Sequence, residues 1–138
     1  MIKIHSGILT DNVEDQIYAG FKEHALECVG VSEFNSFQNF YTLDKQENLQ
    51  GIVVVQLFWG TLYIKYLFVT KPYRRKGLGT SLIEKALNYG ADNNCKFVFV
   101  ETMSFQAIDF YKKFGFYKEF VRHGFSNGVS VHYLKKEL

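Results

Sequence analysis

Hydrophobic residues recur every three or four positions near the start of the chain, and this spacing predicts an amphipathic helix that faces a core. The residues of this stripe are Val13, Ile17, Phe21, Ala25 and Cys28. Asp11 precedes the stripe and Glu14 follows three positions later, so Asp11 is predicted to be the N-cap of a capping box. Residues 30–39 follow neither a helical nor a strand period, and we expect a loop or a short helical turn there.

From residue 40 the pattern changes to short apolar runs, bounded by polar turns, with two further helical stretches among them. The predicted elements are strands at 40–43, 49–58, 62–69, 96–102, 116–120 and 129–134, and helices at 77–93 and 104–114. The first three strands are close in sequence and are expected to form an antiparallel meander. Together these elements predict an α+β fold, a three-layer α/β/α sandwich around one mixed, mostly antiparallel sheet, with residues 1–138 as a single domain.

Composition and charge restrict the classes of partner. The 138 residues are 47% hydrophobic and carry a formal net charge of +2, so no strong global field points to nucleic acid or to a membrane surface. The apolar runs at 52–55 and 97–100 are far shorter than the roughly 20 residues that cross a bilayer. The 2 cysteines lack metal spacing and no N-terminal hydrophobic signal is apparent, which favours a cytoplasmic location. The 4 histidines share no ligand spacing, so no metal site is expected.

The most specific feature is a basic, glycine-containing segment between a predicted strand and a predicted helix. It reads Lys-Pro-Tyr-Arg-Arg-Lys-Gly-Leu-Gly-Thr over residues 71–80. Its glycines let backbone amides approach an anion, and the helix N-terminus adds partial positive charge at the same place. Its basic side chains supply donors suited to a pyrophosphate. A third glycine for a dinucleotide fingerprint is missing, and no Gly-Lys-Ser/Thr ends the segment as in a P-loop.

The spacing of Arg74, Gly77 and Gly79 resembles the Q/R-x-x-G-x-G/A signature of the GCN5-related N-acetyltransferases. Residues 107–116 are similar to the A-x-x-F/L-Y-x-x-x-G-F helix of the same family. Residues 101–107 read Glu-Thr-Met-Ser-Phe-Gln-Ala, as in the small antibiotic-type acetyltransferases, although Ser104 replaces the family's commoner Asn. The resemblance covers residues 49–120 and implies that the chain binds acetyl-CoA as its cosubstrate.

The resemblance also implies a role for each matching segment. Backbone groups of Leu67, Phe68 and Val69 would bind the pantetheine arm and the thioester carbonyl, where two central strands splay apart. The pyrophosphate would be bound by Arg74, Arg75, Lys76, Gly77, Leu78, Gly79 and Thr80. Tyr111 matches the tyrosine with which the family protonates the departing thiolate of coenzyme A.

Proton removal from the attacking amine needs a base, and Glu101 is the leading candidate because it ends a strand just before the predicted Tyr111 helix. His132 and Glu33 are the next candidates. Each assignment has a structural alternative, since Glu101 also fits an ion pair with Lys96 and Tyr111 also fits a packed core position. Most of the aromatic residues from Phe34 to Trp59 are expected in the core, and a minority in the acceptor cleft.

We therefore predict an acetyl-CoA-dependent N-acetyltransferase that acts on a primary amine of a small molecule by direct nucleophilic attack. Two alternatives stay open. One is a non-catalytic coenzyme A-binding module, and the other is a nucleic-acid-binding domain that uses the basic segment and exposed aromatic rings. No motif identifies the acceptor amine, and the sequence leaves the oligomeric state open, a homodimer included.

Overall fold

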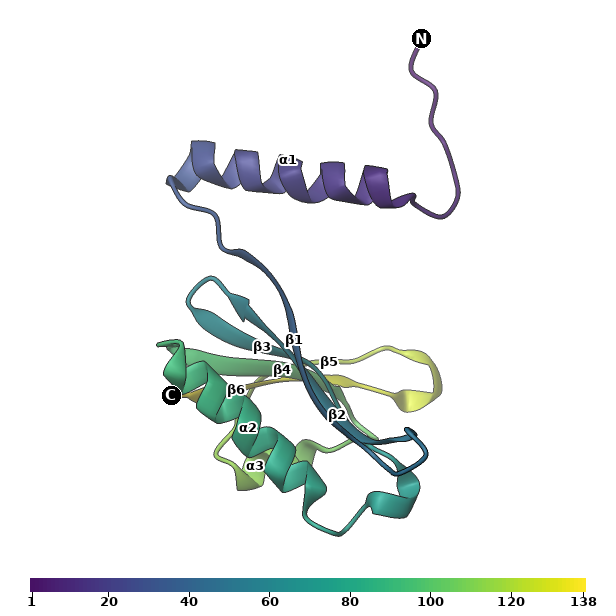
Figure 1. Ribbon diagram of the computed structural model, residues 1–138, viewed down its shortest axis with the longest axis vertical. Helices are drawn as coiled ribbons and strands as arrows, with labels where there is room; N and C mark the ends of the chain where they lie inside the picture. The colour runs from purple at the N-terminus through teal and green to yellow at the C-terminus, as the bar shows by residue number, and fades with distance from the viewer. The chain divides into compact units, whose positions relative to one another are not determined.

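Residues 1–138 are described by a computed structural model, with the exception of the side chain of Phe34 (Figure 1). Contacts within the chain separate Met1–Phe34 from Asn35–Leu138, so each unit is described by itself. The prediction that Phe34 is a core or cleft aromatic lies outside the described side chains. Among the helices that are described, none combines the length and the hydrophobicity needed to cross a membrane.

The first unit is built around α1, Asp11–Val29, and its predicted N-cap is wrong by one residue. Thr10 has an extended backbone, and its side-chain oxygen accepts a hydrogen bond from the N–H of Val13 at 3.3 Å. Asp11 is therefore the first helical residue, where its negative charge interacts favourably with the positive end of the helix dipole. No residue of α1 is buried within this unit, so the core that its apolar stripe faces stays a prediction.

The second unit contains one sheet and two further α-helices. Its elements are β1 (Phe34–Leu43), β2 (Leu49–Phe58), β3 (Thr61–Val69), η1 (Lys71–Tyr73), α2 (Leu78–Asp92), β4 (Phe97–Met103), α3 (Ile108–Lys113), β5 (Tyr117–Arg122), η2 (Ser126–Gly128) and β6 (Val131–Glu137). In the described part of the chain the sheet has six strands in the order β1-β2-β3-β4-β6-β5. The β3–β4 pair is parallel, whereas β2–β3, β4–β6 and β5–β6 are antiparallel. The predicted α+β class with a mixed, mostly antiparallel sheet is confirmed.

Two predicted boundaries are wrong, and in both cases polar side chains make contacts that the local pattern does not reveal. The sequence predicts a loop or a short helical turn over 30–39, but β1 begins at residue 34. The side-chain amide of Asn35 donates to the carbonyl of Leu57 at 3.2 Å, and that of Gln56 donates to the carbonyl of Asn35 at 2.8 Å. A helix was expected from Ser104, but α3 begins at Ile108 because the Ser104 hydroxyl bonds elsewhere.

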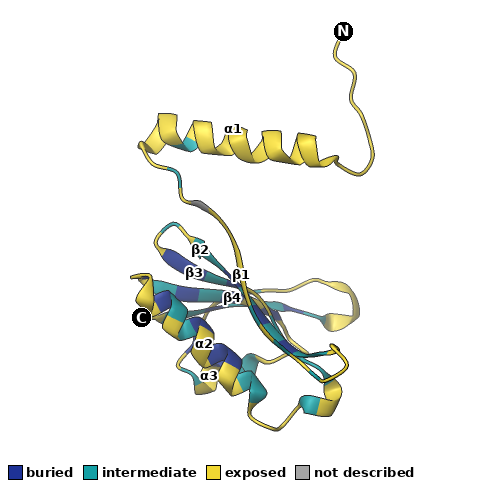
Figure 2. Ribbon diagram, in the orientation of Figure 1, coloured by how far each residue is buried: buried dark blue, intermediate teal, exposed yellow. Residues whose placement is uncertain are grey.

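The core of the second unit lies between the sheet and α2 (Figure 2). The largest fully buried side chains are Leu62, Ile64, Ile83, Leu134, Val53, Val55 and Val98. Gly51 on β2 allows α2 to approach closely, because a Cβ atom at this position would lie 2.9 Å from Cδ2 of Leu78 and 3.1 Å from Cδ1 of Leu82. This packing fixes the start of α2 against the sheet, and the start of α2 carries the basic segment.

Candidate active site

The two central strands are paired over only part of their length. The parallel ladder of β3 and β4 ends at the pair Ile64–Val100. Beyond it, β3 continues to Val69 on its β2 side and β4 continues to Met103 on its β6 side. Next to this last pair, Lys65 is an extra residue in the β2–β3 ladder and forms a β-bulge. A bulge bends and twists a strand, and this explains why the pairing of β3 with β4 ends here. A gap bounded by two unpaired strand edges therefore opens between residues 65–69 and 101–103, as the resemblance implied.

Peptide groups near the end of β3 point alternately toward β2 and toward this gap. The N–H of Thr70 donates to the carbonyl of Gln50 at 2.9 Å, so Thr70 faces β2. By alternation, the peptide groups of Phe68 also point to β2, while those of Leu67 and Val69 point to the gap. Of the three residues predicted to offer backbone hydrogen bonds there, two have the required orientation.

Arg74 contacts the same strand end, and nothing in the sequence pattern reveals this contact. Its Nε–H donates to the carbonyl of Val69 at 2.9 Å, and its guanidinium carbon lies 5.8 Å from the ring centre of Phe68. Arg74 therefore ties the basic segment to β3 and keeps its positive charge beside the gap. A ligand amide that bonds to the Val69 carbonyl competes with this contact.

The segment between η1 and α2 has the backbone geometry of a nest, in which successive amides are free to face one ligand. Arg75 and Gly77 both have left-handed backbones, with φ angles of 62° and 82°. Gly77 is the N-cap of α2, and among the described residues no side chain caps this helix. The N–H groups of the first helical turn therefore have no intrahelical partner and point outward. No atom of the described chain lies within 4 Å of the place where a Gly77 Cβ would be, so the nest is open to a ligand.

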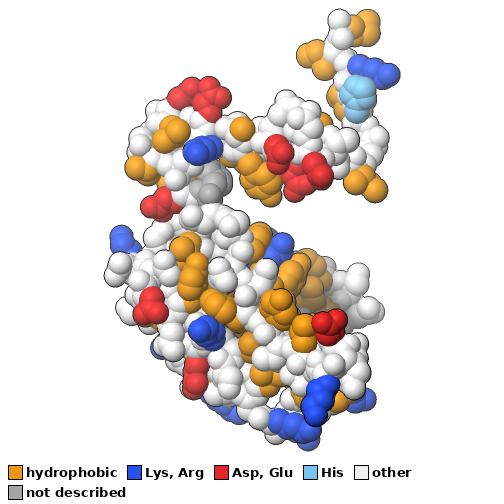
Figure 3. Space-filling view, in the orientation of Figure 1, with side chains coloured by type: hydrophobic (Ala, Val, Ile, Leu, Met, Phe, Trp, Pro, Cys, Tyr) orange, Lys and Arg blue, Asp and Glu red, His pale blue; other side chains and the backbone are white. Residues whose placement is uncertain are grey.

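Positive side chains surround the nest. Figure 3 shows Lys and Arg gathered at the end of the second unit that carries the η1–α2 segment, and Arg74, Arg75 and Lys76 are all exposed. Thr80 is exposed in the first turn of α2, whereas the Leu78 side chain packs against the core and can contribute only its backbone. Amides, helix dipole and cationic side chains thus suit a diphosphate.

Gly79 has a packing role in addition to its predicted place in the nest. A Cβ atom at Gly79 would lie 3.5 Å from Cε1 of Phe110 and 3.8 Å from Cγ2 of Val69. The start of α2 is therefore in close contact with both α3 and the end of β3. This contact also shows that α2 and α3 cover the same face of the sheet (Figure 1).

Tyr111 is buried on α3, with 4% of its surface exposed. Its ring makes edge-to-face contacts with Phe110 and Phe116 at centroid distances of 5.6 and 5.3 Å. Burial raises the pKa of the Tyr111 phenol well above its ordinary value, so the hydroxyl stays protonated at neutral pH. Tyr111 belongs to the same core cluster as Val100, which is the last β4 residue paired with β3.

Glu101 lies on the opposite face of β4 from the buried Val100 and Thr102, because successive side chains of a strand alternate. Its carboxylate is exposed, and its cross-strand partner is Tyr133. Tyr63 lies on the same face, because it pairs with Phe99, two positions before Glu101. Burial, and then the charge of Glu101, raise the pKa of Tyr63. The structure therefore separates the predicted base and the predicted acid onto the two faces of the sheet, on either side of the gap.

The other two base candidates lie elsewhere. His132 is paired with Thr102 in the β4–β6 ladder, and its Nε2 lies 3.0 Å from the Ser130 hydroxyl. Its Nδ1 is buried and has no hydrogen-bond partner in the described part of the chain. Glu33 belongs to the first unit. Among the described residues, no three His, Cys, Asp or Glu side chains gather in a group that suits a metal ion.

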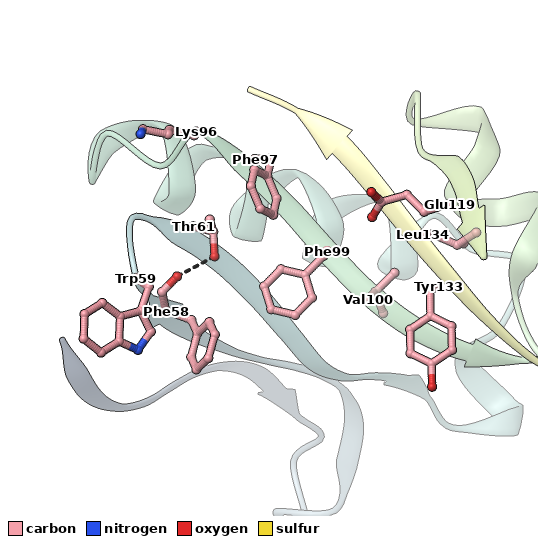
Figure 4. Close-up of a pocket in the computed structure, with 10 residues that line it drawn as sticks. All are labelled: Phe58, Trp59, Thr61, Lys96, Phe97, Phe99, Val100, Glu119, Tyr133 and Leu134. Atoms are coloured by element: carbon pink, nitrogen blue, oxygen red, sulfur yellow. Dashed lines mark hydrogen bonds between the residues drawn. The ribbon is translucent and has the colours of Figure 1, made fainter. Parts of the chain in front are cut away.

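A separate hollow of about 500 Å³ lies at the other end of the central strands (Figure 4). It is lined by Phe58, Trp59, Thr61, Lys96, Phe97, Phe99, Val100, Glu119, Tyr133 and Leu134. Thr61 and Phe97 are the first residues of β3 and β4, whereas the gap and the nest lie where β3 ends. The hollow is rich in aromatic rings and has Lys96 as its basic lining residue, whereas Arg74, Arg75 and Lys76 lie at the nest, so the two regions differ in character.

Acetyltransferases from other organisms are similar to this chain in sequence. An N-alpha-acetyltransferase from Sulfolobus acidocaldarius is 27% identical over 154 residues, which cover 100% of this chain and 85% of that protein. A blasticidin-S acetyltransferase from Streptomyces morookaense is 31% identical over 99 residues, or 71% of this chain and 73% of that protein.

Solved structures extend the match to three dimensions. A protein from Agrobacterium tumefaciens, assigned as an acetyltransferase, has a TM-score of 0.86 at 23% identity, with 100% of both chains covered. A protein from Bacillus anthracis, assigned as a streptothricin acetyltransferase and solved with acetyl coenzyme A, has a TM-score of 0.65 at 23% identity over 78% of this chain and 65% of that one. The family model for the acetyltransferase (GNAT) family matches residues 9–116. The chain therefore belongs to the GNAT family and is an N-acetyltransferase with acetyl-CoA as its cosubstrate.

Proposed function

We propose that the nest at the start of α2 binds the pyrophosphate of acetyl-CoA and that the gap between β3 and β4 binds its acetyl-pantetheine arm. The observation that carries this proposal is the position of the uncapped helix, whose left-handed N-cap Gly77 lies in the segment that connects α2 to the strand with an unpaired edge. The peptide groups of Leu67 and Val69 are suited to the pantetheine amides and the thioester carbonyl. The positive charges of Arg74, Arg75 and Lys76 favour the phosphates.

The groups that interact with the attacking nitrogen and with the departing sulfur then lie on opposite faces of the sheet. A neutral amine attacks the thioester carbon, and a C–N bond forms as the C–S bond breaks. Glu101, on one face, accepts the proton that the attacking nitrogen loses. Tyr111, on the other face, donates a hydrogen bond to the departing sulfur, and the thiolate then takes up a proton from water. Because burial raises the pKa of Tyr111, it is a weak acid, and we infer that hydrogen-bond donation to the developing thiolate is its main contribution.

For the acceptor, we propose a primary amine of a small molecule. Support comes from the Glu-Thr-Met-Ser-Phe-Gln-Ala segment at 101–107 and from the similarity to a blasticidin-S acetyltransferase. The second candidate is the α-amine of a protein N-terminus, because the relative from Sulfolobus acidocaldarius matches the entire chain. Both acceptors use the same chemistry at the nitrogen and differ in what surrounds it.

A panel assay separates the two acceptors. The purified protein is mixed with acetyl-CoA and, in separate reactions, with aminonucleoside and aminoglycoside antibiotics, polyamines, or short peptides with free N-termini. Release of the coenzyme A thiol gives the rate, and mass spectrometry locates the acetyl group. We expect small amines to react fastest and the Tyr111→Phe protein to be slow with every acceptor. A rate with peptides far above that with small amines would refute the small-molecule assignment.

A further inference from the structure

Tyr111 is carried by α3, a helix of only six residues. A helix this short is not stable through its own hydrogen bonds, and no side chain of the described chain caps its N-terminus. The position of Tyr111 therefore depends on its packing in the core and on the segments that connect α3 to the sheet. After the helix, the N–H of Phe116 donates to the carbonyl of Tyr111 at 3.2 Å and connects it to the next strand.

The segment before α3 folds back on the end of β4. The backbone N–H of Gln106 donates to the carbonyl of Met103 at 2.9 Å, and the side-chain oxygen of Gln106 accepts from the N–H of Met103, also at 2.9 Å. These bonds close a tight local turn over residues 103–106. By themselves they do not connect α3 to any distant part of the chain.

Ser104, in the middle of this turn, makes that distant connection. Its N–H donates to the carbonyl of Ser130 at 2.8 Å, and its hydroxyl oxygen accepts from the N–H of Ser130 at 3.0 Å. Ser130 is buried just before β6, and its own hydroxyl lies 3.0 Å from Nε2 of His132. The family resemblance assigns an Asn to the position of Ser104, and in this chain the serine hydroxyl supplies the acceptor.

We propose that Ser104 and Ser130 form a clamp that positions Tyr111, by joining the turn before α3 to the loop between β5 and β6. This loop ends where β4 ends, since Val131 pairs with both Met103 and Arg122. It contains left-handed backbones at Gly124, Asn127 and Gly128, with φ angles of 96°, 58° and 70°. The clamp is thus a specific attachment between this turn-rich loop and the helix that carries the proposed acid.

The two serines have separable roles in the clamp. The hydroxyl of Ser104 accepts a clamp bond, so Ser104→Ala removes that bond and leaves the other. Ser130 contributes only backbone atoms to the clamp, so Ser130→Ala keeps both clamp bonds and removes only the contact with His132. Ser104 is exposed, and Ser104→Thr retains the hydroxyl without a steric conflict in the core.

The first measurement is hydrogen exchange at the amide of Ser130, which needs no substrate. We expect exchange to be about fivefold faster in Ser104→Ala, as for the loss of one hydrogen bond, and near the wild-type rate in Ser104→Thr and Ser130→Ala. Thr42→Val is the control, because the buried Thr42 hydroxyl has no hydrogen-bond partner in the described part of the chain. Wild-type exchange in Ser104→Ala would refute the clamp.

The second measurement tests positioning and rests on the proposed function. With the best acceptor from the panel, we expect kcat to fall about tenfold in Ser104→Ala and to recover in Ser104→Thr, while the Kd for acetyl-CoA is unchanged. Fast exchange with a wild-type kcat would refute the positioning role, as would an equal loss of acetyl-CoA affinity. If the wild-type protein binds no acetyl-CoA, the proposed function fails together with the positioning role, and the exchange result still decides whether the clamp exists.

Discussion

The nest at the start of α2 can be tested with two nearly isosteric substitutions, Gly77→Asn and Gly77→Asp. Gly77 has a φ angle of 82°, a conformation that Asn and Asp tolerate better than other side chains. No atom of the described chain lies within 4 Å of the new Cβ. Both variants are therefore expected to fold, with a similar loss of stability of about 1 kcal/mol.

The two variants differ in charge at the place where the diphosphate is proposed to bind. A carboxylate about 4 Å from a phosphate charge costs about 1 kcal/mol in the dielectric of water and about 4 kcal/mol at the effective dielectric near a protein surface. The Kd of Gly77→Asp for acetyl-CoA should therefore exceed that of Gly77→Asn by between about fivefold and about a thousandfold. The increase in Kd should lie toward the lower end of this range, because the positive charges of Arg74, Arg75 and Lys76 are exposed around the nest.

Isothermal titration calorimetry with acetyl-CoA measures both affinities, and thermal melts verify that the two proteins are equally folded. The difference between the variants should shrink as salt is raised, because exposed charges are screened within about 10 Å at 0.1 M. Equal affinities of Gly77→Asp and Gly77→Asn at low salt would refute the assignment of the nest to the diphosphate. Absence of binding by the wild-type protein at millimolar acetyl-CoA would refute the whole cosubstrate site.

Three further substitutions test the acid, the base and the packing of α2. Tyr111→Phe should lower kcat about a hundredfold in the coenzyme A release assay with an unchanged Kd for acetyl-CoA. The wild-type protein should lose unfolding free energy in urea melts as the pH rises above 10.0, because burial raises the pKa of Tyr111 above that ordinary value and only the unfolded phenol ionises there. Tyr111→Phe should lose less unfolding free energy over the same pH range. Glu101→Gln should lower kcat about a hundredfold at neutral pH and recover in pH–rate profiles as hydroxide replaces the missing base. Gly51→Val should cost about 2 kcal/mol in urea melts, since its Cβ would lie 2.9 Å from Cδ2 of Leu78.

Much of the fold follows from hydrophobic periodicity, because burial against a neighbouring element determines those positions. The α2 stripe and the central strands belong to this class, and their predicted bounds are close to the observed ones. The boundaries of β1 and α3 were predicted wrongly because polar side chains there form hydrogen bonds with residues far away in the sequence. Asn35 bonds to β2 and lets β1 begin early, while Ser104 bonds to Ser130 and delays the start of α3. A pattern of hydrophobicity carries no information on such partners.

The candidate site also has some features that the local sequence predicts and others that depend on the fold. The glycines and basic residues of 71–80 predict a nest for anions from the local sequence alone, since a left-handed N-cap such as Gly77 requires a residue without a bulky side chain. The gap between β3 and β4 was accessible only through the family resemblance. Its physical cause is the extra residue Lys65 in one ladder, which alters the course of β3 just beyond the last parallel pair. The contact of Arg74 with Val69 depends on the fold and has no signature in the sequence.

The separation of Glu101 and Tyr111 onto two faces of the sheet keeps the carboxylate proposed as the base away from the phenol proposed to contact the sulfur. A carboxylate beside a tyrosine raises the pKa of the phenol and competes for its hydroxyl hydrogen. Tyr63 receives this influence from Glu101, whereas burial alone raises the pKa of Tyr111. The hydroxyl of Tyr111 therefore remains available to the sulfur, and the carboxylate of Glu101 remains available to the amine. Strand alternation at Val100, Glu101 and Thr102 produces this division, and we propose that the missing β3–β4 pairs give a thioester access to both groups.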